Sequence, residues 1–230
     1  MTIEAILFDF NGVIIDDEPV HCDAWRAALA PFDLTFTDEE YYGPLLGIPD
    51  TYFLDHLLKM RGVSLAPRTA AELLNEKRSL YDQLVRRRNV DPPGLAAFVR
   101  DAAAHVPVAV VSGALRQEIE YHLQRLELAG IFKAIVAAGE YQAAKPDPEP
   151  YLVGLRALSQ ATGKTYAPGA VLTVEDSGHG VASARAAGMP VLGYAGRIAP
   201  EVLHGSFAVI YDFSLLTFEI LEQMFTAYFL

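Results

Sequence analysis

The sequence is poor in cysteine, in basic residues and in long apolar runs, and each shortage excludes a class of protein. Cys22 is the only cysteine among 230 residues, so an internal disulfide and a multi-cysteine metal site are both excluded. Lysine and arginine number 18 against 29 acidic residues, and the net charge of -11 argues against nucleic-acid and anionic-membrane partners. No apolar run approaches the roughly 20 residues that span a bilayer. The first residues lack the pattern of a secretory signal, so we expect a cytoplasmic protein.

Short β-rich runs alternate with amphipathic helical stretches along most of the chain. This alternation is typical of a parallel α/β sheet. The predicted strands are Ile3–Phe8, Val106–Val111, Ala134–Ala138, Ala170–Val174, Pro190–Tyr194 and, more weakly, Ala208–Tyr211. The sequence therefore predicts an α/β fold with a doubly wound parallel (Rossmann-like) sheet.

The interval between the first two strands shows only helical periodicity. Thr37–Glu40 and Thr69–Glu72 both have the form of a capping box, which marks a helix N-terminus. The Asp91–Gly94 stretch contains two prolines and a glycine and interrupts regular structure before the alternation resumes. We therefore predict an inserted all-α cap domain at residues 16–89, with residues 1–15 and 90–230 forming the α/β core.

Polar residues follow the predicted strands at the ends where open parallel sheets bind ligands. In strand order they are Asp9, Ser112 with Gly113, Lys145, and Glu175 with Asp176. Each alone is an ordinary turn or capping residue. Together they bring three carboxylates, a hydroxyl and a lysine to one edge of one sheet, and burying three carboxylates requires a compensating cation. Oxygen ligands suit a hard ion, so the pattern indicates Mg²⁺ together with a phosphorylated substrate.

These segments resemble, in order and spacing, the four motifs of the haloacid dehalogenase superfamily. The motifs read Asp9-Phe10-Asn11-Gly12, Ser112-Gly113, Lys145-Pro146-Asp147 and Glu175-Asp176. The helical insert is similar to the cap of the subgroup that contains beta-phosphoglucomutase and phosphoglycolate phosphatase. The resemblance covers essentially the whole chain and implies a Mg²⁺-dependent phosphatase that acts on a small phosphorylated metabolite, as a monomer or weak homodimer.

The resemblance also implies roles for single residues. Asp9 matches the nucleophile that forms an aspartyl-phosphate and ligates the metal, and Asn11 falls where the family ligates Mg²⁺ through a backbone carbonyl. Ser112 and the Gly113 N–H would hold the phosphoryl group at the start of a helix. Lys145 would neutralise charge on the nucleophile and the phosphoryl oxygens.

Three further groups of residues receive roles from the same resemblance. Glu175 and Asp176 match the acidic pair that anchors Mg²⁺ directly or through water. Lys77 matches a cap lysine that contacts substrate in the sugar-phosphate mutases, and His21 matches a histidine that those mutases keep near the proton-transfer residue. We expect both residues to bind substrate, and we expect the cap to act as a lid with Lys77 facing the strand ends. A snorkelling lysine and a structural histidine are the competing interpretations. Within Gly47–Asp50, an acid stands where those mutases carry an arginine, so a second phosphate would be repelled and a bisphosphate mutase is disfavoured.

Asn11 departs from the family pattern, because phosphatases and mutases carry an aspartate there that protonates the leaving group. An amide cannot do this, and a positioned acid–base group contributes typically about 10²–10⁴-fold. Four explanations compete: an engineered substitution, a replacement acid at Asp16, Asp17 or Glu18, a different bond cleavage, or a non-catalytic protein that binds phosphometabolites. The carbon–halogen branch needs no Mg²⁺ and carries an aromatic residue at this position. The carbon–phosphorus branch uses a cap lysine and a small residue there.

Overall fold

The computed structural model describes residues 2–43, 45, 50–88 and 90–229, and the chain divides into two compact units. The core unit comprises Met1–Asp16 and Asp91–Leu230, and the helical unit comprises Asp17–Val90. Both observed boundaries lie one residue beyond those of the predicted 16–89 insert. Asp16 belongs to the core unit, where Arg197 Nε donates to its carboxylate at 2.5 Å.

The described part of the core unit contains one sheet of six parallel strands. Its strands are β1 (Ala5–Phe8), β2 (Val108–Val111), β3 (Ala134–Val136), β4 (Val171–Glu175), β5 (Val191–Tyr194) and β6 (Ala208–Ile210). Their order across the sheet is β3-β2-β1-β4-β5-β6. The predicted doubly wound parallel sheet is therefore confirmed, with each strand end within two residues of its expected position.

The strand order reverses direction between β1 and β4. Strands β2 and β3 extend the sheet on one side of β1, while β4, β5 and β6 extend it on the other. All residues of β1, β2, β4 and β5 are buried, as expected for strands covered on both faces. Ligands of open α/β sheets bind beyond the carboxyl ends of the strands at such a switch point, and β1 and β4 end there.

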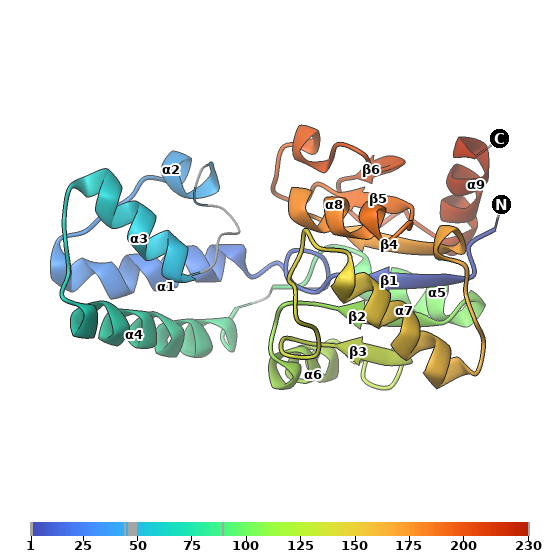
Figure 1. Ribbon diagram of the computed structural model, residues 1–230, viewed down its shortest axis with the longest axis horizontal. Helices are drawn as coiled ribbons and strands as arrows, with labels where there is room; N and C mark the ends of the chain where they lie inside the picture. Colours follow the sequence, from blue (N-terminus) through green and yellow to red (C-terminus); the bar gives the residue numbers. More distant parts are fainter. Residues whose placement is uncertain (1, 44, 46–49, 89, 230) are drawn as a thin grey trace. The chain divides into compact units, whose positions relative to one another are not determined.

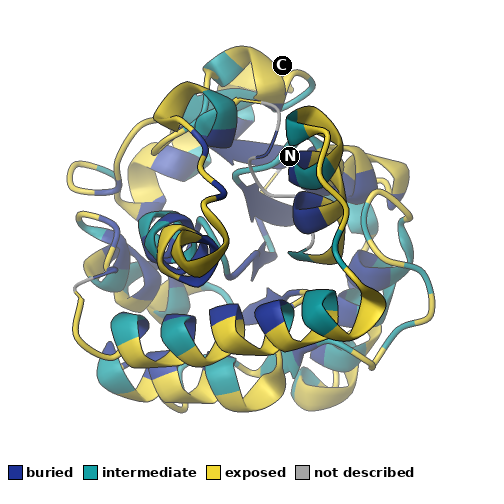
Figure 2. Cartoon of the chain, turned by 90° about the vertical axis from the view of Figure 1, so that its left-hand side faces the viewer, coloured by how far each residue is buried: buried dark blue, intermediate teal, exposed yellow. Residues whose placement is uncertain are grey.

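Helices cover both faces of the sheet (Figure 1). Helices α7 (Glu149–Thr162) and α8 (Gly178–Ala186) pack on the face formed by Leu7, Val111 and their neighbours. Helices α5 (Leu95–His105) and α9 (Phe218–Tyr228) contact each other, and α5 packs on β2. The remaining elements are α6 (Arg116–Arg125) and the short 3-10 helices η2 (Pro168–Ala170) and η3 (Pro200–Leu203). Strands β1, β2, β4 and β5 are buried throughout and β3 and β6 only partly, whereas the helices also carry exposed faces (Figure 2).

The described residues of the helical unit form no strand and enclose a separate apolar core. Its elements are α1 (Glu18–Leu29), η1 (Ala30–Phe32), α2 (Asp38–Tyr42), α3 (Asp50–Arg61) and α4 (Pro67–Val85). Trp25 stacks on Phe53 at a centroid distance of 4.3 Å, and Cys22 is buried beside them, as expected for a small apolar residue. Across the described residues, no helix combines the length and apolar character needed to cross a membrane.

The two expected capping boxes have different outcomes. The first is confirmed, because Glu40 N donates to Thr37 Oγ1 at 3.1 Å and Thr37 N donates to Glu40 Oε2 at 2.9 Å. The second is wrong, because α4 begins at Pro67 and Thr69 already lies inside the helix. Proline lacks an N–H and has a helical φ, so it is well suited to the first helical position.

Candidate active site

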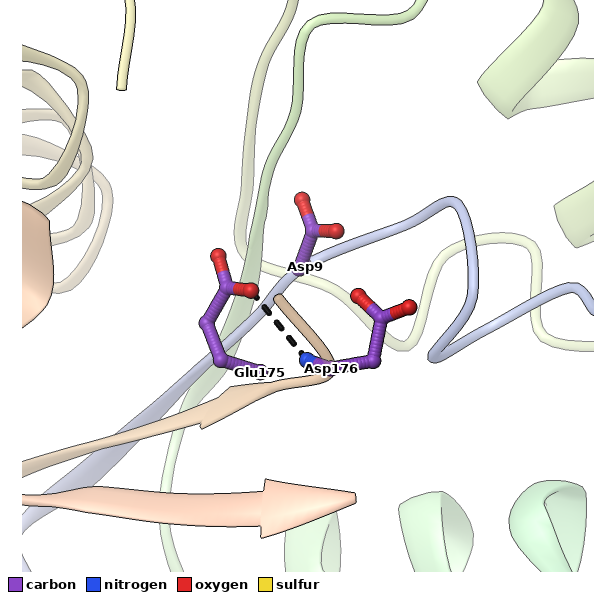
Figure 3. Close-up of side chains that lie close together, drawn as sticks. All are labelled: Asp9, Glu175 and Asp176. Carbon is purple, nitrogen blue, oxygen red and sulfur yellow. Dashed lines mark hydrogen bonds between the residues drawn. The ribbon is translucent and has the colours of Figure 1, made fainter. Parts of the chain in front are cut away.

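Three carboxylates meet at the switch point of the sheet (Figure 3). Asp9 directly follows β1, and its backbone N–H donates to Val174 O at 3.0 Å, which continues the pairing with β4. Glu175 is the last residue of β4 and Asp176 follows it. One carboxylate oxygen from each residue lies within 4.8 Å of the others. The structure places these three acids together at one edge of the sheet, as predicted.

Two glycines make room for these carboxylates. Gly12 has φ +81°, and a Cβ at this position would lie 1.9 Å from Asp176 Oδ2. A Cβ at Gly180, in the first turn of α8, would lie 1.9 Å from Glu175 Oε1. A side chain at either position would displace the carboxylate that it meets, so both glycines are part of the site. Gly12 ends the first motif and Gly180 lies in the first turn of the helix after the fourth, yet neither position reveals its function from sequence.

Lys145 joins two of the three carboxylates. Its Nζ donates to Asp9 Oδ1 and to Glu175 Oε1, each at 2.6 Å, and to Val111 O at 3.3 Å. The loop that carries Lys145 is fixed from the following helix, because Glu149 Oε2 accepts from Ala143 N at 2.7 Å. Most of the lysine side chain is buried, with 15% exposed. The predicted contact between this lysine and the proposed nucleophile is therefore present.

Burial and charge act in opposite directions on this cluster. Burial raises the pKa of Asp9 to about 7, although the neighbouring Lys145 ammonium opposes the rise. Burial by itself lowers the pKa of Lys145, but the charges of Asp9 and Glu175 outweigh it and raise that pKa above its usual range. Lys145 is therefore a fixed cation, and Asp9 gains its negative charge most readily when a second cation is near.

Ser112 and Gly113 follow β2, the neighbour of β1. Ser112 is buried, its N–H donates to Val136 O at 2.9 Å, and its Oγ accepts from Ala114 N at 3.0 Å. The Tyr141 hydroxyl donates to Ser112 O at 3.2 Å. The loop thus has a fixed conformation next to the strand that carries Asp9. A Cβ at Gly113 would meet only Tyr141 at 3.6 Å, so this glycine is not required for steric reasons.

Asn11 lies in the tight turn after β1, where it forms an isolated bridge with Ile15. The three candidate replacement acids already have partners. Asp16 binds Arg197 as described above, Asp17 Oδ2 accepts from the Tyr81 hydroxyl at 2.5 Å, and Glu18 Oε1 accepts from Tyr41 at 2.6 Å. Burial raises the pKa of Glu18, so it is the candidate that best retains a proton.

Lys77 and His21 belong to a partly buried polar network inside the helical unit. Lys77 is 1% exposed, and its Nζ lies 2.6 Å from Asp50 Oδ1 and 2.7 Å from His21 Nδ1. His21 Nε2 faces Asp17 Oδ2 at 3.3 Å, and its ring stacks on Tyr81 at 4.1 Å. Lys77 is therefore not a snorkelling surface lysine. The acid noted at the end of Gly47–Asp50 is its ion-pair partner, while residues 47–49 lie outside the described residues.

Two site residues escaped the sequence reasoning. The Tyr151 hydroxyl donates to Glu175 Oε1 at 2.5 Å, and the Ser177 hydroxyl donates to Glu175 Oε2 at 3.1 Å. Burial, followed by the charge of Glu175, raises the pKa of Tyr151 well above its ordinary value, so its hydroxyl remains a donor. Ser177 directly follows the Glu175-Asp176 motif, and this position was a signal that could have found it. Tyr151 had no such signal, because its helical spacing is that of a core residue.

The donor set fits a hard divalent cation. The three clustered groups are all carboxylates, and the missing Cβ of Gly12 lets the Asp176 side chain lie against the turn that follows Asp9. Mg²⁺ prefers oxygen ligands and is commonly held by one or two carboxylates, with substrate phosphate completing its shell. The residues present therefore suit the metal expected from the sequence.

Comparisons with known proteins agree with this geometry. Over 191 residues the chain is 27% identical to a phosphorylated carbohydrates phosphatase from Thermotoga maritima, covering 81% of this chain and 82% of that protein. Over 186 residues it is 30% identical to the Escherichia coli fructose-1-phosphate phosphatase YqaB, covering 80% of this chain and 92% of that protein. A crystal structure of beta-phosphoglucomutase from Clostridium difficile shares the fold, with a TM-score of 0.79 at 24% identity over 99% of both chains. Residues 3–188 match the haloacid dehalogenase-like hydrolases, and the chain belongs to that family.

Proposed function

We propose that this protein is a Mg²⁺-dependent phosphatase that acts on a small phosphorylated sugar through an aspartyl-phosphate at Asp9. The observation that carries the proposal is the buried ion cluster in which Lys145 Nζ contacts Asp9 and Glu175 at 2.6 Å each. Such a cluster offers a carboxylate nucleophile with a fixed cation beside it. The third carboxylate, from Asp176, adds a site for a divalent ion.

In the first step, one oxygen of Asp9 attacks phosphorus, the bond between phosphorus and the sugar oxygen breaks, and the sugar leaves as an alkoxide that takes a proton from solvent. Lys145 contacts Oδ1, so attack by Oδ2 would preserve that ion pair. In the second step, water attacks phosphorus, which releases phosphate and regenerates the Asp9 carboxylate. The covalent intermediate divides one difficult displacement into two easier ones.

The transferring phosphoryl group needs donors and positive charge around its oxygens. Ser112 Oγ and the Gly113 N–H are the proposed donors, and Lys145 is the proposed cation. Preorganised groups of this kind stabilise charge that develops in the transition state without reorganisation during the reaction. The buried position of Ser112 supports this role, because its loop does not have to be ordered when substrate binds.

The proposed metal ligands are the side chains of Asp9 and Asp176 and the backbone carbonyl of Asn11, with Glu175 as a further candidate from the motif. A bound Mg²⁺ would offset the repulsion among the carboxylates and the phosphoryl oxygens. The rise in the Asp9 pKa to about 7 supports the need for this second cation. The chain's own residues supply the nucleophile and the donors.

Asn11 limits the rate in this proposal, because no aspartate protonates the departing sugar oxygen. We expect Asn11→Asp to raise kcat for phosphate-monoester hydrolysis by about 10²-fold or more. Asparagine and aspartate are nearly isosteric, so the change isolates proton transfer. Phosphate release should be measured for both proteins on a panel of sugar phosphates that includes fructose 1-phosphate. Asp9→Asn in the faster background is the control and should abolish release.

Equal rates before and after Asn11→Asp would contradict the proposed acid–base defect. Such a result would direct attention to Glu18, whose pKa is already raised by burial. Its matched test is Glu18→Gln in the background that keeps Asn11. If Glu18→Gln lowers the rate and Asn11→Asp leaves it unchanged, the proton transfer belongs to Glu18.

The relatives named for phosphorylated carbohydrates support the choice of a sugar phosphate as substrate. Lys77 and His21 remain the predicted substrate-binding residues. The Asp50 carboxylate 2.6 Å from Lys77 Nζ offsets the charge of that lysine, which supports a substrate with one phosphate rather than two. A phosphomutase that works through a bisphosphate is disfavoured for the same reason.

Asn11 also favours a second candidate function, which is binding of a phosphorylated ligand without turnover. The site would keep its anion donors and lose the chemical step. The two functions separate when phosphate binding and phosphate release are measured on the same preparations. Binding in both proteins, with no release even after Asn11→Asp, would identify a binding protein.

A further inference from the structure

Glu175 is saturated by hydrogen-bond donors in the described part of the chain. Its Oε1 accepts from Lys145 Nζ at 2.6 Å and from the Tyr151 hydroxyl at 2.5 Å. Its Oε2 accepts from the backbone N–H groups of Asp176 and Ser177 at 3.2 and 3.3 Å, and from the Ser177 hydroxyl at 3.1 Å. A carboxylate has about four lone-pair positions. The five donors therefore occupy the lone-pair positions of the Glu175 carboxylate and leave none for a metal ion.

The first turn of α8 closes the space around the same carboxylate. Ser177 caps this helix, because its Oγ accepts from Gly180 N at 3.0 Å while its hydroxyl donates to Glu175. A Cβ at Gly180 would lie 1.9 Å from both Glu175 Cδ and Oε1. The Glu175 side chain is 0% exposed. Its carboxylate cannot turn toward a new ligand without displacing this helix start.

Tyr151 holds the other side of Glu175. The tyrosine lies in the first turn of α7, is 0% exposed and belongs to the apolar cluster that includes Leu7 and Val111. Its ring also lies under the lysine, with Lys145 Nζ 4.8 Å from the ring centroid. The apolar core thus fixes the ring, and the ring contacts both members of the Glu175–Lys145 pair.

We propose that Tyr151 is a positioning residue for phosphoryl transfer, which fixes Glu175 as an anionic anchor for Lys145 rather than as a ligand of the metal. The proposal rests on the proposed phosphatase function and assigns the metal to Asp9 and Asp176 among the three carboxylates. Asp176 differs from Glu175 in being half-buried and lying against Gly12 in the turn after Asp9. Tyr151 acts through Glu175 on Lys145, and Lys145 acts on the phosphoryl group.

Tyr151→Phe tests this role, because it removes one hydroxyl and keeps the ring. Tyr166→Phe is the matched control, since Tyr166 belongs to the same apolar cluster, is 5% exposed and donates to Thr162 Oγ1 at 3.0 Å. In the Asn11→Asp background, we expect Tyr151→Phe to lower kcat about tenfold or more. Tyr166→Phe should leave kcat unchanged. Equal kcat values in the two variants would overturn the positioning role.

The metal assignment has its own readout. Calorimetric titration with Mg²⁺ should give the same affinity for the wild type and Tyr151→Phe, because neither Asp9 nor Asp176 loses a contact. A fall in Mg²⁺ affinity in Tyr151→Phe that parallels the fall in kcat would make Glu175 a ligand and overturn the proposal. Asp176→Asn is the positive control and should weaken Mg²⁺ binding.

A double-mutant cycle shows whether Tyr151 acts through Glu175. If it does, Glu175→Gln with Tyr151→Phe should be no slower than Glu175→Gln alone, since residues in one network are not additive. Additive losses would refute the route through Glu175.

If Asn11→Asp has no measurable turnover, titration with inorganic phosphate in the presence of Mg²⁺ replaces kcat. Phosphate that binds more weakly to Tyr151→Phe but not to Tyr166→Phe would support the positioning role even without turnover. Equal phosphate affinity in the two variants would overturn it.

Discussion

The two units each contain a buried lysine in an ion pair, and the two lysines differ in their partners. In the core unit, Lys145 Nζ lies 2.6 Å from two carboxylates, of which the Asp9 side chain is 12% exposed and the Glu175 side chain is 0% exposed. In the helical unit, Lys77 Nζ lies 2.6 Å from one carboxylate, and the Asp50 side chain is 36% exposed. Its second partner is a ring nitrogen of His21 at 2.7 Å.

The difference in partners reverses the direction of the pKa shift. Burial lowers the pKa of both lysines, but the two buried carboxylates raise the Lys145 pKa above its usual range. At Lys77 the lowering by burial exceeds the contribution of Asp50, and the pKa falls below its usual range. One buried lysine is therefore a fixed cation and the other can lose its proton more easily. Two buried carboxylates, rather than burial itself, decide which behaviour results.

The largest expected effect comes from removing each charge in turn. Lys145→Met in the Asn11→Asp background should lower kcat by about 10²–10³-fold, the usual loss when a preorganised charge is removed. Lys77→Met should act mainly on KM, because Lys77 is predicted to bind substrate rather than the transferring group. Steady-state phosphate release measures both. A fall in kcat of equal size in the two variants would remove the functional distinction between the lysines.

Removing one carboxylate partner from each lysine should affect stability unequally. Glu175→Gln breaks a pair in which the carboxylate is fully buried and the lysine mostly so, and it should cost about 3 kcal/mol or more of unfolding free energy. Asp50→Asn breaks a pair with a half-exposed carboxylate and should cost about 1 kcal/mol or less.

Each unit offers its own spectroscopic signal for this test. Trp25 is the single tryptophan, and it lies in the helical unit with Lys77 Nζ 5.4 Å from its ring. Urea unfolding followed by tryptophan fluorescence therefore reports on Asp50→Asn, and circular dichroism follows Glu175→Gln. A larger loss of unfolding free energy in Asp50→Asn than in Glu175→Gln would contradict this expectation.

Much of the core unit could be predicted from its sequence, because strands, turns and motif residues are local signals. The carboxyl ends of β1, β2 and β4 are marked by polar residues, so Asp9, Glu175 and Asp176 could be assigned to one sheet edge before any coordinates. The Lys145 contact followed from the resemblance. Glycine positions gave no comparable signal, because the need for Gly180 depends on a carboxylate that folding brings against its helix.

The long-range partners could not be predicted. Tyr151 is separated from Glu175 by 24 positions, and Lys77 from Asp50 by 27, so neither pair has a local signature. The resemblance placed Lys77 in the cap but could not name the groups that stabilise its charge. The helix start at Pro67 was missed because Thr69–Glu72 imitated a cap, although proline at the first position was the stronger signal.

The smallest expected effect is a pH dependence of stability that belongs to Lys77. The folded-state pKa of Lys77 lies below the ordinary value of 10.5, because burial disfavours its charge. Between the folded-state pKa and 10.5, the unfolded chain binds more protons than the native protein, so stability rises with pH. Below that window both states are protonated, and the gain is lost. The stability of the wild type relative to Lys77→Met should therefore increase from neutral pH toward pH 10.

Lys164→Met is the control, because the hydrogen bond that Lys164 donates to Glu4 raises the Lys164 pKa and confines its titration to higher pH. Urea unfolding at several pH values measures the difference, with tryptophan fluorescence for Lys77→Met and circular dichroism for Lys164→Met. A difference between wild type and Lys77→Met that stays constant or falls with pH would show that Lys77 remains a fixed cation like Lys145.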